Sequence, residues 1–198
     1  SSFGGYPMSQ FDKDDVEDIG LLKLDVLGIR MQSAISHALG EIERVEGERV
    51  ELDALAPFDD PDTYDLIARA ATLGCFQIES PGQRELLGKF GPVDFADIII
   101  DISLFRPGPV KSDMVRPFLN ARHGWAEPQY LHPDLEPVLR PTYGVVVFHE
   151  QVIDMLHVIT GCSRAEGDEK RRALGDPDGQ AETRAWFYRQ ARLRGYDL

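Results

Sequence analysis

The chain has 198 residues, of which 42% are hydrophobic and 28% are charged. This length and composition fit one domain, or a large piece of one, and exclude a disordered tail. No apolar run reaches the roughly 18 residues that a membrane span needs. The first five residues contain no Met and no basic segment, so we expect no signal peptide, no membrane contact and a cytoplasmic protein.

The net charge of −13 is unevenly distributed along the chain. Residues 1–66 hold 16 acidic and 5 basic side chains, whereas residues 67–198 hold 18 and 16. DNA-binding surfaces are usually basic, so this balance weakens a DNA-binding hypothesis. It does not exclude one, because a phosphate contact needs only a local cluster of cations. Cys75 and Cys162 are too few for a disulfide framework or a four-ligand zinc site, and we expect reduced thiols.

The first elements expected in chain order are a strand and two helices. Residues 21–27 alternate with a period of two, which predicts a strand with Lys23 and Asp25 on one face. Apolar residues recur at helical spacing over 31–45, which predicts an amphipathic helix. A second helix begins at Pro61, after an aspartate that can cap it, because proline at the first helical position gives up an N–H that has no partner there.

The rest of the chain predicts mostly helices. Capping boxes begin at Ser80 and Ser163, and each should open a helix. Residues 71–78 predict an extended segment, and the β-branched run 143–148 predicts a short strand. Further helices are expected from residue 81 onward, over 95–104 with most of its side chains buried, over 150–160, from 164 to Gly175, and over about 180–194. The predicted fold class is therefore α+β, mainly α-helical, with its strands concentrated early.

Lys23 and Asp25 form the first candidate site. Two residues apart on one strand face, such side chains lie about 7 Å apart and can both point into a cleft. One carboxylate does not hold a magnesium ion unaided, because such sites usually combine two carboxylates with substrate phosphates. The same pair also fits an exposed strand face with a loose ion pair.

Consecutive basic residues at 170–172 form the second candidate site. Neighbouring residues on a helix point roughly 100° apart, so Arg171 and Arg172 could grip one polyphosphate from two sides. Arginine suits this role because its planar guanidinium makes bidentate contacts with phosphate oxygens. Asp168 and Glu169 precede the cluster, so a solvated helix face is the alternative.

Arg106 begins an Arg-Pro-Gly-Pro loop and is the third candidate. The prolines stiffen the loop and the glycine allows close backbone approach, which would hold Arg106 in place. A structural turn after a buried helix explains the same residues equally well.

Other familiar sites are not indicated. The histidines are scattered, and His149-Glu150 is the one pair that resembles metal ligands, without an HExxH motif around it. The chain also contains no Walker A motif and no GxGxxG. Zinc, P-loop and Rossmann sites are therefore not expected.

Six segments occur together in a recognisable order. They are 10–28, 76–80 (FQIES), 104–109 (LFRPGP), 142–145 (TYGV), 150–152 (EQV) and 171–175 (RRALG). This series resembles the bacterial C-family DNA polymerases, the replicative polymerase III alpha subunit and its relatives. The first segment resembles the end of the palm, and the other five resemble the fingers. The resemblance covers roughly residues 7–198, and the shared order of the motifs makes it specific.

Within that family, segments 75–87, 101–114 and 147–151 resemble the error-prone branch. Replicases usually continue the Arg-Arg-Ala motif into a lysine pair, whereas Gly175 is followed here by Asp176. This difference argues against a lysine contact to phosphate just past the helix.

The resemblance implies roles for the candidate residues. Asp25 matches the third acidic residue of the palm, which completes a two-metal magnesium site, and Lys23 would reach a phosphate of DNA or substrate. Arg171 and Arg172 match fingers arginines near the incoming triphosphate, and Arg106 would shape the nucleotide pocket. The implied partners are primer–template DNA, deoxynucleoside triphosphates, and other repair or replication proteins.

The resemblance also implies a division of the chain. Residues 1–29 are expected to be the C-terminal end of the palm, and residues 30–198 the N-terminal part of the fingers. The family's closely spaced aspartate pair lies upstream, so we expect an internal fragment that is inactive alone. The predicted function is that of an error-prone DNA polymerase in damage-tolerant synthesis.

Two alternatives stay open at this point. A non-catalytic, polymerase-like scaffold of a DNA repair assembly would keep the fold without the chemistry, and the upstream aspartate pair would distinguish it. An unrelated acidic interaction module would require the ordered motifs to be a coincidence.

Overall fold

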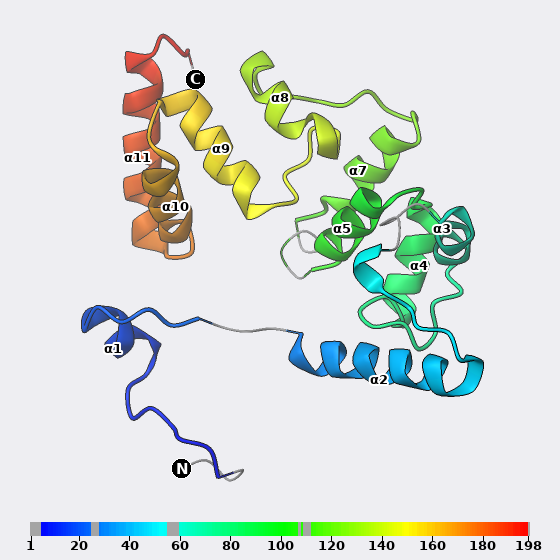
Figure 1. The fold of residues 1–198 in the computed structure, drawn as a ribbon. Helices are drawn as coiled ribbons and strands as arrows, with labels where there is room; N and C mark the ends of the chain where they lie inside the picture. The colour runs from blue at the N-terminus through cyan, green and yellow to red at the C-terminus, as the bar shows by residue number, and fades with distance from the viewer. Residues whose placement is uncertain (1–4, 25–27, 55–59, 107, 109–111, 198) are drawn as a thin grey trace. The chain divides into compact units, whose positions relative to one another are not determined.

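A computed structural model of the chain describes residues 5–24, 28–54, 60–106, 108 and 112–197. The chain divides into two compact units, an N-terminal unit over Ser1–Pro57 and a C-terminal unit over Phe58–Leu198. Helices make up the regular structure of both units (Figure 1). The expected short strands are wrong wherever those residues are described, since no strand occurs there. In the same residues, no helix combines the length and apolar character needed to cross a membrane.

The N-terminal unit contains α1 (Lys13–Asp18), α2 (Ile29–Glu46) and the short 3-10 helix η1 (Leu52–Ala54). The helix predicted over 31–45 is confirmed by α2, which ends at Gly47 in a left-handed conformation. None of the α2 side chains is buried. Residues 21–24 are not a strand, because a strand needs a neighbour to pair its backbone groups and the described residues offer none.

The C-terminal unit begins with α3 (Pro61–Ala68), α4 (Pro81–Phe90), α5 (Phe95–Leu104) and α7 (Val115–Arg122). The predicted helix starts are confirmed: the Asp60 carboxylate accepts from the Asp62 N–H, and the Ser80 hydroxyl accepts from the Gln83 N–H. The helix predicted over 95–104 has the predicted bounds, but the prediction that most of its side chains are buried is wrong, since four of its ten residues are. Buried side chains of α4, α5 and α7 form the α5 cluster, which consists of Leu86, Phe90, Ile100, Leu104 and Phe118.

Arg122 ties α7 to the turn between α4 and α5. Its guanidinium makes a bidentate ion pair with Asp97, at 2.7 and 2.6 Å, and both side chains are largely buried. It also donates to the Phe90 and Gly91 carbonyl oxygens, at 2.9 and 3.0 Å. The charge-assisted bonds therefore close the turn that would otherwise leave helix-end carbonyls unpaired.

The second half of this unit contains η2 (Pro133–Leu135), α8 (Glu136–Leu139), η3 (Arg140–Thr142), α9 (His149–Thr160), α10 (Arg164–Ala173) and α11 (Pro177–Leu193). Helices α9, α10 and α11 pack against one another, as the yellow-to-red ribbons of Figure 1 show. Helices α9 and α11 share a core with η2 and α8, which we call the α9 cluster and which consists of Leu135, Leu139, Ile159 and Ala191. The predicted end of α9 at Gly161 is confirmed by its left-handed φ of 74°.

The run 143–148 is not the predicted strand. It begins with a turn in which Tyr143 and Gly144 both have positive φ, 53° and 85°. The three valines that follow, 145–147, form what we call the valine strip: Val145 and Val147 pack on the α5 cluster, and Val146 packs on the α9 cluster. β-branched side chains occur here because both faces of the strip pack against a core, without a neighbouring strand.

The extended segment predicted over 71–78 is also wrong. Backbone bonds from Cys75 N–H to Thr72 oxygen and from Ile78 N–H to Cys75 oxygen curl it into successive turns. Gln77 takes a left-handed conformation with φ 65°, which no regular strand contains. The buried Thr72 hydroxyl donates to the Ile78 carbonyl and closes the loop on itself.

Candidate functional site

Of the two candidate residues in the segment that resembles the palm, the structure describes one. Lys23 is exposed in a segment without regular structure, and Asp25 lies outside the described residues. Because residues 21–24 are not a strand, the predicted strand face at Lys23 is wrong, and the proximity of Asp25 to Lys23 stays a prediction. Among the residues that the structure describes, no group of three or more His, Cys, Asp or Glu side chains is arranged to hold a metal ion. No metal ligand is assigned from those residues.

Arg106 lies in a polar pocket where α4 begins and α5 ends. The cavity has a volume of about 340 Å³. We call it the Arg106 pocket, and its lining residues are Gln77, Gln83, Ile102, Phe105 and Arg106. Two motifs that are separate in the sequence, 76–80 and 104–109, thus contribute to one cavity.

A contact between Gly82 and Phe105 brings the two sides of the Arg106 pocket together. A β-carbon on Gly82 would lie 2.5 Å from the ring of Phe105, closer than real side-chain contacts allow. Glycine in the first turn of α4 therefore permits the end of α5 to approach. This approach places Gln83 and Arg106 around the same cavity.

Beneath the pocket, Gln83 bonds to a buried acid on α5. Asp101 is fully buried and accepts a hydrogen bond from the Gln83 carboxamide nitrogen. Its other oxygen, Oδ1, has no partner among the residues that the structure describes. Burial raises the pKa of Asp101 to about 7, and the bond from Gln83 acts in the opposite direction.

Sequence reasoning missed this pair. It assigned Gln83 to a capping box, in which its side chain would turn back to the helix start, but the side chain extends to Asp101 instead. The available signal was an aspartate between Ile100 and Ile102 in an otherwise apolar helix. An acid at such a position is rarely buried without a partner.

The paired arginines of α10 converge on a single carboxylate. Arg171 donates to Asp168 through Nε and Nη2, at 2.9 and 2.8 Å from Oδ1. The Nε atom of Arg172 lies 3.3 Å from the second oxygen of the same carboxylate. The Arg171 side chain is 23% exposed and that of Arg172 is 59% exposed, so both remain accessible from solvent. Both arginines thus contact one acid of their own helix, which a solvated helix face would also show, and their grip on a polyphosphate stays a prediction.

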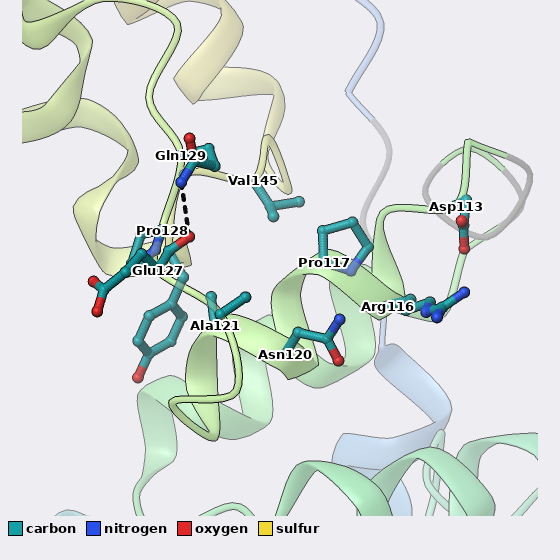
Figure 2. Close-up of a pocket in the computed structure, with 12 residues that line it drawn as sticks. Asp113, Arg116, Pro117, Asn120, Ala121, Glu127, Pro128, Gln129 and Val145 are labelled. Atoms are coloured by element: carbon teal, nitrogen blue, oxygen red, sulfur yellow. Dashed lines mark hydrogen bonds between the residues drawn. The ribbon is translucent and has the colours of Figure 1, made fainter.

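A larger pocket lies beside α7. Its volume is about 480 Å³, and it is lined by Arg116 and Asn120 of α7, by residues 126–129, and by the turn at 143–145 (Figure 2). The turn can lie there only because residue 144 is glycine, since a β-carbon would overlap the Gln129 carbonyl. A third family-like motif, 142–145, therefore also lines a cavity.

The chain is similar to known proteins over most of its length. The sequence model of the bacterial DNA polymerase III alpha subunit finger domain matches residues 31–195. The chain belongs to this family. The predicted resemblance to C-family polymerases is confirmed. The match contains the positions of Arg106, Arg171 and Arg172.

Three relatives illustrate the similarity. DNA polymerase III subunit alpha of Pseudomonas aeruginosa is 42% identical over 205 residues, which cover 98% of this chain and 17% of that protein. The corresponding subunit of Escherichia coli K12 is 39% identical over 202 residues, with 97% and 17% covered. Error-prone DNA polymerase of Symbiobacterium thermophilum is 42% identical over 170 residues, with 86% and 15% covered.

This finger-domain chain spans about one sixth of the length of these relatives. The replicative subunit of Pseudomonas aeruginosa and the error-prone polymerase of Symbiobacterium thermophilum are both 42% identical to it, so identity does not separate the two branches. Membership of the error-prone branch therefore stays a prediction, and so do the roles of the individual site residues.

Proposed function

We propose that this chain is part of a DNA polymerase that adds deoxynucleotides to a primer 3′ end in damage-tolerant synthesis. Family membership supports the polymerase activity. In this proposal, residues 1–29 end the palm, residues 30–198 begin the fingers, and the partners are primer–template DNA, deoxynucleoside triphosphates and other repair or replication proteins. The error-prone role rests on the resemblance of segments 75–87, 101–114 and 147–151, and the cytoplasm is the proposed location.

The observation that carries the proposal is the convergence of Arg171 and Arg172 on Asp168. Carboxylate and phosphate oxygens fit the same guanidinium fork, so a site that accepts the Asp168 carboxylate is shaped for a phosphate as well. We infer that the triphosphate of the incoming nucleotide displaces Asp168 from the two arginines. Phosphoryl transfer depends mainly on positioning and charge neutralisation, which two fixed cations supply.

The palm residues complete the proposal. Asp25 is proposed as a ligand for magnesium, together with carboxylates from other parts of the polymerase. Bound magnesium ions would activate the primer hydroxyl and stabilise the leaving pyrophosphate. Lys23 is proposed to neutralise a phosphate of DNA or nucleotide, and Arg106 to shape the nucleotide pocket from the end of α5.

The decisive experiment is primer extension by the full-length polymerase. Asp25→Asn keeps the size of the side chain but removes the charge that holds metal, so extension should fall by orders of magnitude. Folding and primer–template binding should persist, and both are measured as controls. Near wild-type extension by the variant would show that Asp25 is not a metal ligand.

Two further measurements use the same primer-extension assay. The 198-residue chain alone should not extend a primer. A full-length wild-type protein that does not extend a primer would favour the non-catalytic scaffold.

A further inference from the structure

Burial of the Asp101 side chain on α5 costs free energy. A buried carboxylate is costly unless several hydrogen bonds or a cation compensate it. Asp97, one turn earlier on α5, has such compensation from Arg122 and from the Val93 N–H. Within the described part of the chain, Asp101 accepts a bond from Gln83 only and leaves Oδ1 without a partner. Stability alone would be served as well by two apolar side chains of similar size.

The effect of Asp101 on Gln83 is specific. Above its pKa of about 7, the Asp101 carboxylate is ionised and can only accept hydrogen bonds, so it fixes which end of a carboxamide faces it. The Gln83 nitrogen points to Asp101, and the Gln83 oxygen is then the end available to the Arg106 pocket. Gln83 is 2% exposed, so packing holds it in this orientation. The pocket consequently presents a cation and a fixed hydrogen-bond acceptor.

We propose that Asp101 is a positioning residue that orients Gln83 to bind a nucleotide in the Arg106 pocket. The nucleotide phosphate pairs with Arg106, and a sugar hydroxyl or base amino group beside it donates to the Gln83 oxygen. This inference rests on the proposed role of Arg106 in shaping the nucleotide pocket, and it adds the contact between Arg106 and phosphate. The nucleotide is either the incoming triphosphate or a nucleotide of the primer–template, because both carry the same groups.

The test uses the full-length polymerase and a double variant, Gln83→Met with Asp101→Leu. Replacing both partners by apolar groups removes the buried charge, so the melting temperature should stay unchanged or rise. Loss of one ligand hydrogen bond should raise either the nucleotide KM or the primer–template Kd about 3- to 10-fold. The value of kcat should change less than about threefold. A rise in nucleotide KM identifies the incoming triphosphate, and a rise in duplex Kd identifies the primer–template.

If the double variant folds poorly, two single variants still test the inference. Asp101→Asn retains an oxygen that can accept from Gln83, so it should keep most of the affinity that the double variant loses. Asp97→Asn is the matched control, because it alters a buried acid on the same helix outside the pocket. It should lower stability without a selective change in KM or Kd.

Two outcomes would overturn the inference. One is a double variant that loses stability and loses activity in proportion to its folded fraction, which would make the pair purely structural. The other is an unchanged KM and Kd in the folded double variant. Arg106→Gln, measured in parallel, separates the two proposals: if it weakens nucleotide or duplex binding while the pair does not, the role of Arg106 stands and this inference alone fails.

Discussion

Individual side chains in this structure are often held in place by an acid. Asp168 holds Arg171 and Arg172, Asp97 holds Arg122, and Asp101 holds Gln83. The exposure of each pair decides what the acid can do. The partly exposed Asp168 can give way to a ligand, whereas the buried acids are fixed by packing.

Replacing Arg171 or Arg172 by Ala in the full-length polymerase should weaken nucleotide use selectively. Each change removes charge-assisted hydrogen bonds worth roughly 1.5–3 kcal/mol, so kcat/KM for the nucleotide should fall about 10- to 150-fold. Primer–template affinity should stay within about threefold, because other contacts hold the duplex. Arg→Lys should restore activity only in part, since a point charge lacks the planar fork.

Nucleotide and duplex titrations at two salt concentrations check this prediction. If the arginines bind DNA phosphates, duplex affinity will fall, and the slope of its salt dependence will flatten by about one unit for each arginine–phosphate pair that the substitution removes. If they are only a solvated helix face, neither parameter will move, and the assignment to the triphosphate is then wrong.

Asp101 should make the stability of the chain depend on pH. Burial raises its pKa from 3.8 to about 7, so between these values the folded state binds a proton that the unfolded state releases. Stability should therefore decrease as pH rises through this window, and the full cost should be present above pH 7. In Asp101→Asn this dependence should disappear, and the variant should be the more stable of the two at pH 8. Urea unfolding of both proteins at pH 5 and pH 8 measures the difference.

At the scale of elements, Arg122 makes the buried ion pair between α7 and the start of α5 and also bonds to the turn after α4. Arg122→Met breaks a buried ion pair and leaves the Asp97 charge uncompensated, which typically costs about 3–5 kcal/mol. Arg164→Met is the matched control, because its ion pair with Asp154 lies at the surface and should contribute less than about 1 kcal/mol. Equal losses in the two variants, measured by urea unfolding, would contradict the assignment of Arg122 as the link.

Helices could be predicted well because their signals are local. Ser80 and Gly161 mark helix ends through their own backbone conformation and hydrogen bonds, independent of distant residues. The strand predictions were wrong because a strand forms only when its backbone pairs with a neighbouring strand, which the local sequence does not reveal. The valines at 145–147 have β-branched side chains but pack against two helical cores. The Gln83–Asp101 pair was missed for the same reason, since the two residues are 18 positions apart and come together only when α4 meets α5.

At the scale of the whole molecule, the two units carry different parts of the proposed function. The N-terminal unit contains the candidates Lys23 and Asp25, and the C-terminal unit contains the three arginine candidates. The acidity of the sequence follows the same division, because residues 1–66 account for most of the net charge. The cationic candidates for nucleotide binding thus lie mainly in the nearly neutral part of the chain.

The valine strip has a consequence for cooperativity within the C-terminal unit. Its three residues pack alternately on the α5 and α9 clusters, so loosening one cluster also weakens the packing of the other. The two halves should therefore unfold in one all-or-none transition.

The two tryptophans can report on the unfolding of each half, since Trp125 lies beside α7 and Trp186 on α11. Trp125→Phe and Trp186→Phe, each leaving one fluorophore, should give coincident midpoints in urea, whereas Val146→Gly should separate them into two steps.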